Sequence, residues 1–485
     1  MDIPYRISIH SSRGTVRYRG QLPIWPGVEV LGVEWDDPTR GKHSGSFEGT
    51  EYFQVRIPNS GSFIKSGRKF DSKNNFSDVL HEKYAPEKLD VDEETDIKFG
   101  NKIAERVGFD KFRRMQAQLD KLRIVALNDR CLAYSSDNLS EICPAIVDLD
   151  LSDNVFDSIS EIAKIVVQLP NLRILRLNKN RLCSWELEVG LLSAFTSLHV
   201  VSLADTLVPV ETLCRFPKLF PAVKELGLAG NRYEFSSLKF ESAWDGLEVL
   251  DLSSNCFATI PKFRVKSDSS LQFTSLNLSS NHITEVLDDY TLSTPLESLD
   301  LRHNQIRTWK SLDRLAAIFP DVNNLKLQWN PVFSDMADSD IKISIIARWA
   351  KVQLVNNMKV SDQERTNAEL YFMAKVVQGN VPDFNRSSLR WKQLCAIYGE
   401  PDFTPQRTKS TVLELTFVYR GQKRIRSLPR GLTVQRVCLL VSKWYKIPVT
   451  KVKLYVDDGS KVEMNDSLRD VEFYNVDSGS KILID

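Results

Sequence analysis

A glycine-rich segment near the N-terminus carries the residue types best suited to binding a ligand. It reads Gly41-Lys42-His43-Ser44-Gly45. Glycine lets a backbone approach a ligand strand closely, and the side chains of Lys42 and Lys65 can pair with carboxylates. Aromatic side chains near the segment can form a slot for another ring, and three are present: Trp35, Phe53 and Phe63. The alternative is that the glycines only make tight turns and that Trp35 and Phe53 belong to a small core.

The elements that must position these residues are short strands. Residues 1–70 are rich in Gly, Pro, β-branched and aromatic residues in alternating runs, which predicts a small β-barrel. The runs 32–46, 49–53 and 61–65 closely resemble the CAP-Gly domain family, whose hallmark Gly-Lys-Asn-Asp-Gly stands here as residues 41–45. The resemblance implies binding of the acidic C-terminal tail of α-tubulin and of similar sequences ending in Glu-Glu-Tyr or Glu-Glu-Phe. His43 and Ser44 depart from the family's Asn and Asp, which changes the hydrogen bonds available there.

A repeated pattern, L-x-x-L-x-L-x-x-N, occupies the middle of the chain. Its asparagine position recurs every 23 to 26 residues, with Arg130 and Thr206 at two of the places: 130, 154, 180, 206, 231, 255, 281, 304 and 330. This spacing is typical of a leucine-rich-repeat solenoid, in which each Leu-x-Leu is a short parallel strand. A buried Asn can satisfy backbone groups of the turn that follows. Apolar residues at helical spacing, such as those of 159–166, predict the convex layer.

The concave surface of such an array exposes a row of side chains from each strand, and solenoids bind partners there. The predicted outward residues are polar and mixed in charge, which suits a large folded protein, although a solvated face would look the same. The candidate contacts are Arg176, Asn178, Glu225, Asp251, Asp300, Arg302, Lys326, Gln328 and the single large aromatic near that edge, Trp329.

Five segments follow from these patterns: a barrel (1–70), an acidic linker (71–106), the solenoid with its caps (107–375), a second linker (376–408) and a last domain (409–485). Residues 71–99 hold nine acidic and four basic side chains, so we expect a solvated tether. Residues 107–119 and 331–350 are the expected caps. The order strand, strand, helix, strand and closing strand in 409–485 predicts a ubiquitin-like β-grasp domain. The fold class is therefore multidomain: β-barrel, α/β solenoid and α+β β-grasp.

Composition excludes several classes of protein. The 64 basic and 63 acidic residues of the 485 leave a charge of +1, so a nucleic-acid partner is not expected. No apolar run is long enough for a membrane span. Phosphate-loop, nucleophile-elbow and His-Glu-x-x-His motifs do not occur, and the seven cysteines form no metal-ligand spacing. We therefore predict a cytoplasmic protein without enzymatic activity, cofactor or metal.

The module order resembles that of the cofactor E family of tubulin-folding chaperones. The resemblance implies a chaperone that captures α-tubulin and acts with the other tubulin-folding cofactors (B, C and D) and their small GTPase to join it to β-tubulin, or to dissociate the heterodimer, in association with the cytoskeleton. Two alternatives remain at this point. One is a microtubule-associated CAP-Gly adaptor, and the other is a ubiquitin-pathway scaffold that presents a client on the repeats.

Overall fold

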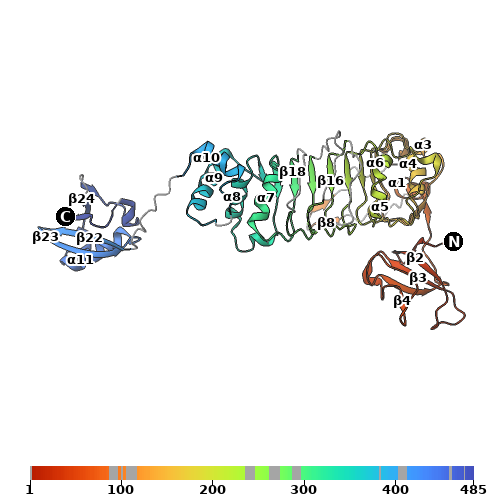
Figure 1. The fold of residues 1–485 in the computed structure, drawn as a ribbon, viewed down its shortest axis with the longest axis horizontal. Coiled ribbons are helices and arrows are strands. Elements are labelled where there is room, and N and C mark those ends of the chain that lie inside the picture. Colours follow the sequence, from red (N-terminus) through yellow and green to blue (C-terminus); the bar gives the residue numbers. More distant parts are fainter. Residues whose placement is uncertain are drawn as a thin grey trace. The chain divides into compact units, whose positions relative to one another are not determined.

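The computed structural model describes residues 3–86, 97–99, 102–104, 117–234, 246–261, 274–286, 296–381, 384–401, 412–457, 461–474 and 476–485 (Figure 1). The chain forms two compact units, Met1–Pro401 and Asp402–Asp485. Among the helices of the described residues, none is both long and apolar enough to cross a membrane.

The N-terminal barrel is built on a four-stranded antiparallel sheet in the order β1-β2-β3-β6. Its strands are β1 (Tyr5–Ile9), β2 (Ser12–Gly20), β3 (Val30–Trp35) and β6 (Gly61–Lys65), with a hairpin of β4 (Ser46–Phe47) and β5 (Thr50–Glu51). One face of the sheet carries an apolar core: Ile7, Ile9, Val16, Leu31, Val33, Trp35 and Ile64. Because side chains alternate along a strand, Phe63 and Lys65 lie on the opposite face from Ile64.

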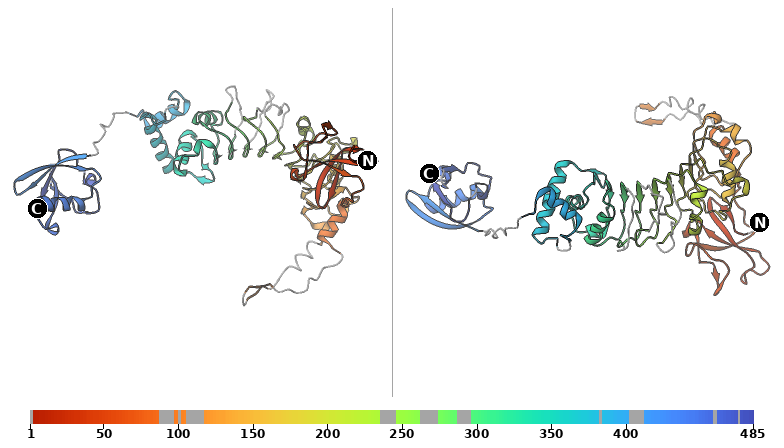
Figure 2. Two further views of the ribbon diagram at one scale, coloured as in Figure 1. Left: turned by 90° about the horizontal axis from the view of Figure 1, so that it is seen from below. Right: turned by 45° about the horizontal axis from the view of Figure 1, so that its top comes forward.

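The repeats form one sheet whose successive strands are parallel, as the 23–26-residue period predicts (Figure 2). The strands are β10 (Ile124–Ala126), β12 (Asp148–Asp150), β13 (Ile174–Arg176), β14 (Val200–Ser202), β15 (Glu225–Gly227), β16 (Val249–Asp251), β17 (Ser275–Asn277), β18 (Ser298–Asp300), β19 (Asn324–Lys326), β20 (Leu354–Val355) and the antiparallel β21 (Met358–Lys359). The central residue of each three-residue strand is buried; it is a leucine except in β10 and β14, where it is Val125 and Val201. The residues on either side are more exposed, apart from Asp300 in β18. Helices between strands are α3 (Leu139–Ile142), α4 (Ile159–Val166), α5 (Val210–Leu213), α6 (Phe216–Leu219) and α7 (Trp309–Ile318).

The repeat asparagines hold the turns together, as predicted. Asn154 donates through Nδ2 to the carbonyls of Leu127 and Leu151, both at 2.9 Å, and its Oδ1 accepts from the Leu132 amide at 3.0 Å. The same pair of carbonyl contacts recurs at Asn180, Asn231, Asn255, Asn281, Asn304 and Asn330. Thr206, which stands at an asparagine position, makes only one of these two carbonyl contacts. Its hydroxyl donates to the Leu203 carbonyl at 2.8 Å.

The residue before each asparagine position of the repeats, including those occupied by Arg130 and Thr206, has a left-handed backbone, with φ between 53° and 69°. We call these residues the turn row: Asp129, Asp153, Lys179, Asp205, Gly230, Ser254, Ser280, His303 and Trp329. Because the strands are in register, the turn row runs along one edge of the sheet.

The acidic linker was predicted to begin at residue 71, and this boundary is wrong. Residues 74–84 form β7 (Asn74–Asn75), which pairs with β11 (Leu132–Tyr134), and α1 (Phe76–Tyr84). Phe76, Val79 and Leu80 are buried in the core of the array, so α1 caps its N-terminal end. β8 (Ile97–Phe99) and β9 (Lys102–Ala104) form a hairpin. The acidic run 90–96 and most of the expected cap 107–119 lie outside the described residues.

The second linker also begins later than expected. The cap at the other end contains α8 (Asp338–Arg348) and α9 (Asp362–Val377), and α10 (Leu389–Tyr398) packs against them. Phe372, Phe384, Trp391 and Leu394 share one buried cluster, and Arg390 pairs with Glu369 at 2.6 Å. Residues 384–398 therefore belong to the cap because their apolar face is buried there.

The C-terminal unit is a β-grasp fold, as predicted. Its sheet has the order β23-β22-β26-β24-β25, with β22 and β26 parallel in the centre. The elements are β22 (Val412–Tyr419), β23 (Gln422–Pro429), α11 (Val434–Tyr445), β24 (Leu454–Asp457), β25 (Lys461–Glu463) and β26 (Lys481–Ile484). Phe417, Val437, Val441 and Ile482 contribute to the core between helix and sheet.

Candidate peptide-binding site

An aromatic cluster covers the sheet face opposite the barrel core. Phe63 is its centre, and the ring centroids of His43 and Phe53 lie 4.7 and 5.5 Å from it. The cluster is completed by rings from β2 and from the 47–52 segment, so its members are Tyr18, His43, Phe47, Tyr52, Phe53 and Phe63. Phe53 is buried, and the other five are half-buried. Rings that are neither buried in a core nor fully exposed can contact a ligand without rearranging the fold.

The strands explain why these rings meet. Tyr18, Gly32 and Phe63 are cross-strand neighbours on β2, β3 and β6. Gly32 leaves the gap that Phe53 fills, since a Cβ there would lie 2.5 Å from the Phe53 ring. The pairing of β2 with β3 shifts between Val16 and Tyr18, and this bulge places Val16 in the core and Tyr18 in the aromatic cluster.

The glycines of the motif are required by close backbone contacts. A Cβ on Gly41 would lie 1.9 Å from the Asn59 carbonyl oxygen, and one on Gly45 would lie 1.8 Å from that of Phe53. Gly45 also has φ +103°, a conformation that side chains rarely adopt. The motif therefore lies directly against the 53–61 segment, which carries part of the aromatic cluster.

His43 and Ser44 replace the family's residues with contacts of their own. The His43 Nδ1 accepts a hydrogen bond from the Gly45 amide at 3.0 Å, which requires an unprotonated nitrogen. Burial, and then the charge of Lys42, lower the pKa of His43 and favour this neutral ring. The Ser44 hydroxyl accepts from the Asn59 amide at 3.0 Å. Both residues thus stabilise the motif's own turns.

Two of the three predicted aromatic residues lie in the aromatic cluster, and the third lies in the barrel core. Phe53 and Phe63 lie in the aromatic cluster, with the exposed side chains of Lys42 and Lys65 on the same segments. Trp35 is 2% exposed and lies in the core, because it is on the same face of β3 as Leu31 and Val33. Tyr18, Phe47 and Tyr52 also belong to the aromatic cluster, although they were not among the candidates named from the sequence. Tyr52 is adjacent to Phe53 in sequence, but the bulge that redirects Tyr18 has no sequence pattern to reveal it.

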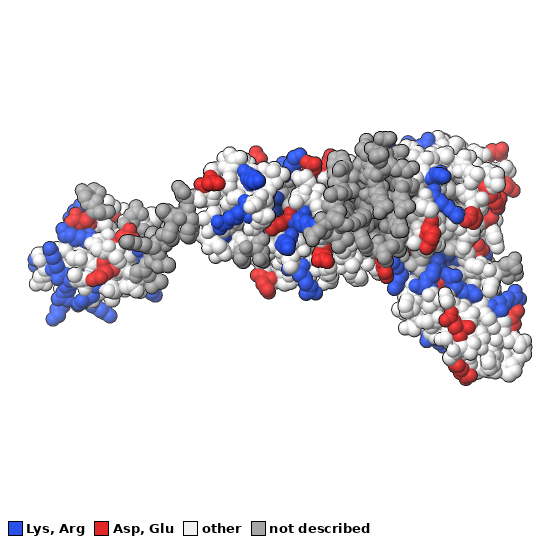
Figure 3. Space-filling model, in the orientation of Figure 1, with Lys and Arg blue, Asp and Glu red and all other residues white. Residues whose placement is uncertain are grey.

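Some of the predicted contact residues on the array already bond to neighbouring array residues, and others are exposed or half-buried. Arg176 pairs with Asp148 across neighbouring strands, and Asn178 accepts from the Ser202 hydroxyl at 2.6 Å. Asp251 accepts from the Ser253 amide at 2.9 Å, while Glu225 is exposed and Lys326 and Gln328 are half-buried. On the face drawn in Figure 3, acidic and basic side chains of the array are interspersed.

Asp300 is the one array residue whose assignment as a contact is corrected. It is 8% exposed and binds Arg302 at 2.7 Å, so it orients that arginine and does not itself face a partner.

Trp329 is the most prominent feature at the C-terminal end of the turn row. Its side chain is 60% exposed and stacks on His303 of the preceding repeat, with ring centroids 4.3 Å apart and planes 7° from parallel. Tryptophan is enriched among the residues that dominate the energy of protein interfaces.

Comparisons with known proteins agree with this architecture. A CAP-Gly domain model matches residues 4–68, and a leucine-rich-repeat model matches residues 292–308. A solved ubiquitin-like domain of mouse tubulin-specific chaperone E is 26% identical, covering 16% of this chain and 91% of that chain, with a TM-score of 0.15. The two family models, together with the β-grasp topology of the C-terminal unit, define a CAP-Gly protein with a leucine-rich-repeat array and a ubiquitin-like domain.

Relatives that align with the chain over nearly their whole length identify the family. Tubulin-specific chaperone E of Bos taurus is 30% identical, covering 99% of this chain and 97% of the relative. The Homo sapiens protein of that name is 29% identical, covering 99% and 97%, and protein PAC2 of Saccharomyces cerevisiae is 29% identical, covering 99% and 96%. The chain belongs to the tubulin-specific chaperone E family.

Proposed function

We propose that the chain is a non-enzymatic tubulin-folding chaperone that binds α-tubulin through two surfaces. The CAP-Gly barrel binds the acidic C-terminal tail, and the repeat array contacts the folded body of the subunit. Together with the other tubulin-folding cofactors and their small GTPase, it acts in assembly and dissociation of the α/β heterodimer in the cytoplasm. Family membership supports the class of function, and the aromatic cluster carries the proposal for the tail.

The chemistry of the barrel fits such a tail. The terminal aromatic ring packs in the aromatic cluster beside Phe63, and the preceding carboxylates lie near Lys42 and Lys65. The Lys65 Nζ lies 5.4 Å from the centre of the Trp25 ring, in the segment between β2 and β3. An edge-to-face contact between rings contributes roughly 0.5–1.5 kcal/mol beyond the burial of apolar area.

The tail assignment is tested with the full chain and an acidic peptide ending in Glu-Glu-Tyr. Removing the terminal tyrosine should weaken binding at least about tenfold, because the aromatic cluster loses its ligand ring. Raising the salt concentration should weaken the intact peptide further, because exposed lysine–carboxylate pairs are screened. A scrambled acidic peptide without an aromatic end is the control. Equal affinity for intact and shortened peptides would contradict the assignment.

For the array, Trp329 is the proposed anchor on the tubulin body. Replacing it with alanine should weaken capture of soluble tubulin about fivefold, since exposed aromatic anchors dominate interface energies. Its exposure means that stability should hardly change. The matched control is Leu389→Ala, an exposed apolar residue of the cap, which should leave capture unaltered. Peptide binding by the barrel should be normal in both variants.

A further inference from the structure

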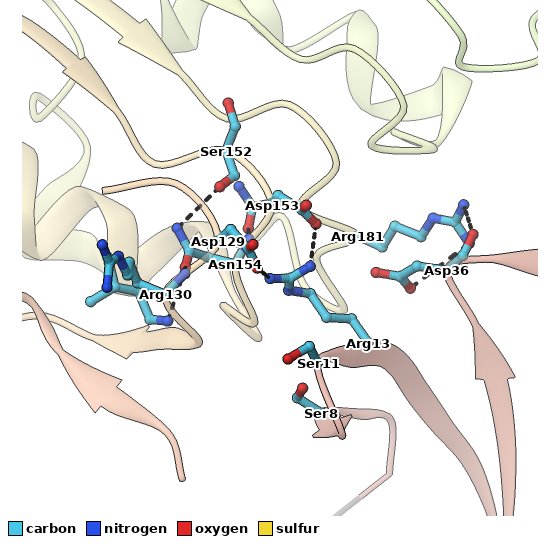
Figure 4. Close-up of polar contacts among 12 residues, drawn as sticks. Ser8, Ser11, Arg13, Asp36, Asp129, Arg130, Ser152, Asp153, Asn154 and Arg181 are labelled. Atoms are coloured by element: carbon cyan, nitrogen blue, oxygen red, sulfur yellow. Dashed lines mark hydrogen bonds and ion pairs between the residues drawn. The ribbon is translucent and has the colours of Figure 1, made fainter. Parts of the chain in front are cut away.

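The barrel and the first repeats share a set of charged contacts between residues far apart in sequence. The Arg13 guanidinium, on β2, reaches two aspartates of the turn row: Asp153, at 2.6 Å, and Asp129 (Figure 4). These aspartates occupy equivalent positions in successive repeats. One side chain of the barrel therefore spans two turns of the array.

A second contact joins the end of β3 to the array. Arg181 donates to the backbone carbonyl of Asp36 at 2.8 Å, and its Nη1 lies 3.8 Å from the Asp36 carboxylate (Figure 4). Arg6 binds both oxygens of that carboxylate, and its Nη1 donates to the Oδ1 at 2.7 Å. Burial alone would raise the pKa of Asp36, but Arg6 and then Arg181 hold it below the usual range. Asp36 is thus a charged link between barrel and array.

Asp157 makes the third contact from the array side. Its carboxylate accepts from the Arg6 backbone amide at 2.5 Å and from the Lys73 ammonium at 2.8 Å. The Arg6 amide is a β1 group that bonds to the array instead of to a neighbouring strand. Its protection from solvent exchange therefore reports directly on this contact.

The arginines of these contacts are buried, whereas the side chains of Asp129, Asp153 and Asp157 are 34–62% exposed, and the charges balance. Arg6 is fully buried, and Arg13 and Arg181 are buried as well. Unpaired charges in such places are costly, whereas a paired and hydrogen-bonded set favours one geometry. Four groups come from the N-terminal segment and four from the array: Arg6, Arg13, Asp36 and Lys73 with Asp129, Asp153, Asp157 and Arg181. We call these eight residues the docking network.

We infer that the docking network fixes the CAP-Gly barrel on the first repeats, so that the barrel and the array form one binding unit. The network and the aromatic cluster use different residues, which leaves the cluster free for a ligand. Helix α1 reinforces the arrangement because residues 74–84 join the array directly after Lys73. A ligand on the aromatic cluster is then held at a fixed position relative to the array, in place of the flexible tether that composition suggested.

The test is hydrogen–deuterium exchange of the full chain, without tubulin, in charge-reversal variants. Asp153→Arg changes only the array side, and Lys179 shows that a basic residue fits the equivalent turn, with φ 61°. Arg13→Glu changes the barrel side. Each should speed exchange in the segment 3–9 at least about tenfold, because repulsion separates the Arg6 amide from Asp157. Combining Arg13→Glu with Asp129→Lys and Asp153→Lys should restore protection.

Arg19→Glu is the matched control. Arg19 lies on the same strand as Arg13, but it is exposed and pairs with Glu29, which belongs to the barrel and not to the array. Hydrogen exchange of segment 3–9 in the Arg19→Glu variant should equal that of the unsubstituted protein. Tail-peptide binding should persist in all variants, which shows that the barrel remains folded. Unchanged exchange in Asp153→Arg and Arg13→Glu, or equal acceleration in Arg19→Glu, would overturn the inference, whatever the outcome of the tubulin experiments.

Discussion

Replacing Phe63 with alanine should weaken tail-peptide binding at least about thirtyfold while the barrel stays folded. Phe63 is half-buried and its ring touches those of Tyr18, His43, Phe47, Tyr52 and Phe53, so its loss removes the centre of the aromatic cluster. A central aromatic anchor commonly contributes about 2 kcal/mol or more to binding, which is about thirtyfold. Titration of the peptide into the full-length variant measures this effect.

Trp35→Ala provides the contrast that separates contact from core. Trp35 is buried among Leu31, Val33 and Ile64, and deleting a buried ring of this size costs about 3–5 kcal/mol of stability. This variant should lose barrel protection in hydrogen exchange, whereas Phe63→Ala should keep it. If Phe63→Ala unfolds the barrel, or binds the peptide normally, the assignment of the aromatic cluster fails.

Gly45→Ala should be the most damaging small substitution in the motif. The added methyl group would lie 1.8 Å from the Phe53 carbonyl oxygen, so the backbone must move. The left-handed conformation adds roughly 1–2 kcal/mol for a residue with a side chain. We expect the barrel to lose at least about 3 kcal/mol of stability and the peptide affinity to fall with it.

Gly67→Ala is the control for this substitution. Gly67 lies in a turn of the same barrel, with open space where its Cβ would be and without a left-handed φ. Exchange rates of residues 3–65 should rise in Gly45→Ala and stay constant in Gly67→Ala. Normal stability of Gly45→Ala would show that the motif tolerates backbone movement, contrary to the geometry.

Strict periodicity explains why most of the architecture could be predicted from sequence. The repeat asparagines predicted the turns because each satisfies the equivalent pair of backbone carbonyls. Trp35 and Phe63 were harder to distinguish. Both are aromatic residues on strands, and only the pairing of β3 with β6 shows that they face opposite sides of the sheet.

The linkers show where average composition misleads. Acidic residues outnumber basic residues in 71–99. Phe76, Val79 and Leu80 nevertheless have the spacing of a buried helical face, and Asn75 caps that helix. The docking network could not be predicted at all. Arg13 and Asp153 are 140 residues apart, and a pair of opposite charges at that separation has no local pattern.

A sedimentation assay with purified tubulin tests the central claim most directly. Full-length protein should hold tubulin in a soluble complex and lower the mass of polymer, because a chaperone that grips the subunit body competes with lattice contacts. Trp329→Ala should weaken this effect, and adding the other tubulin-folding cofactors should strengthen it. The adaptor alternative predicts the opposite. Protein that pellets with undiminished polymer and never enriches a soluble tubulin complex would contradict the chaperone account.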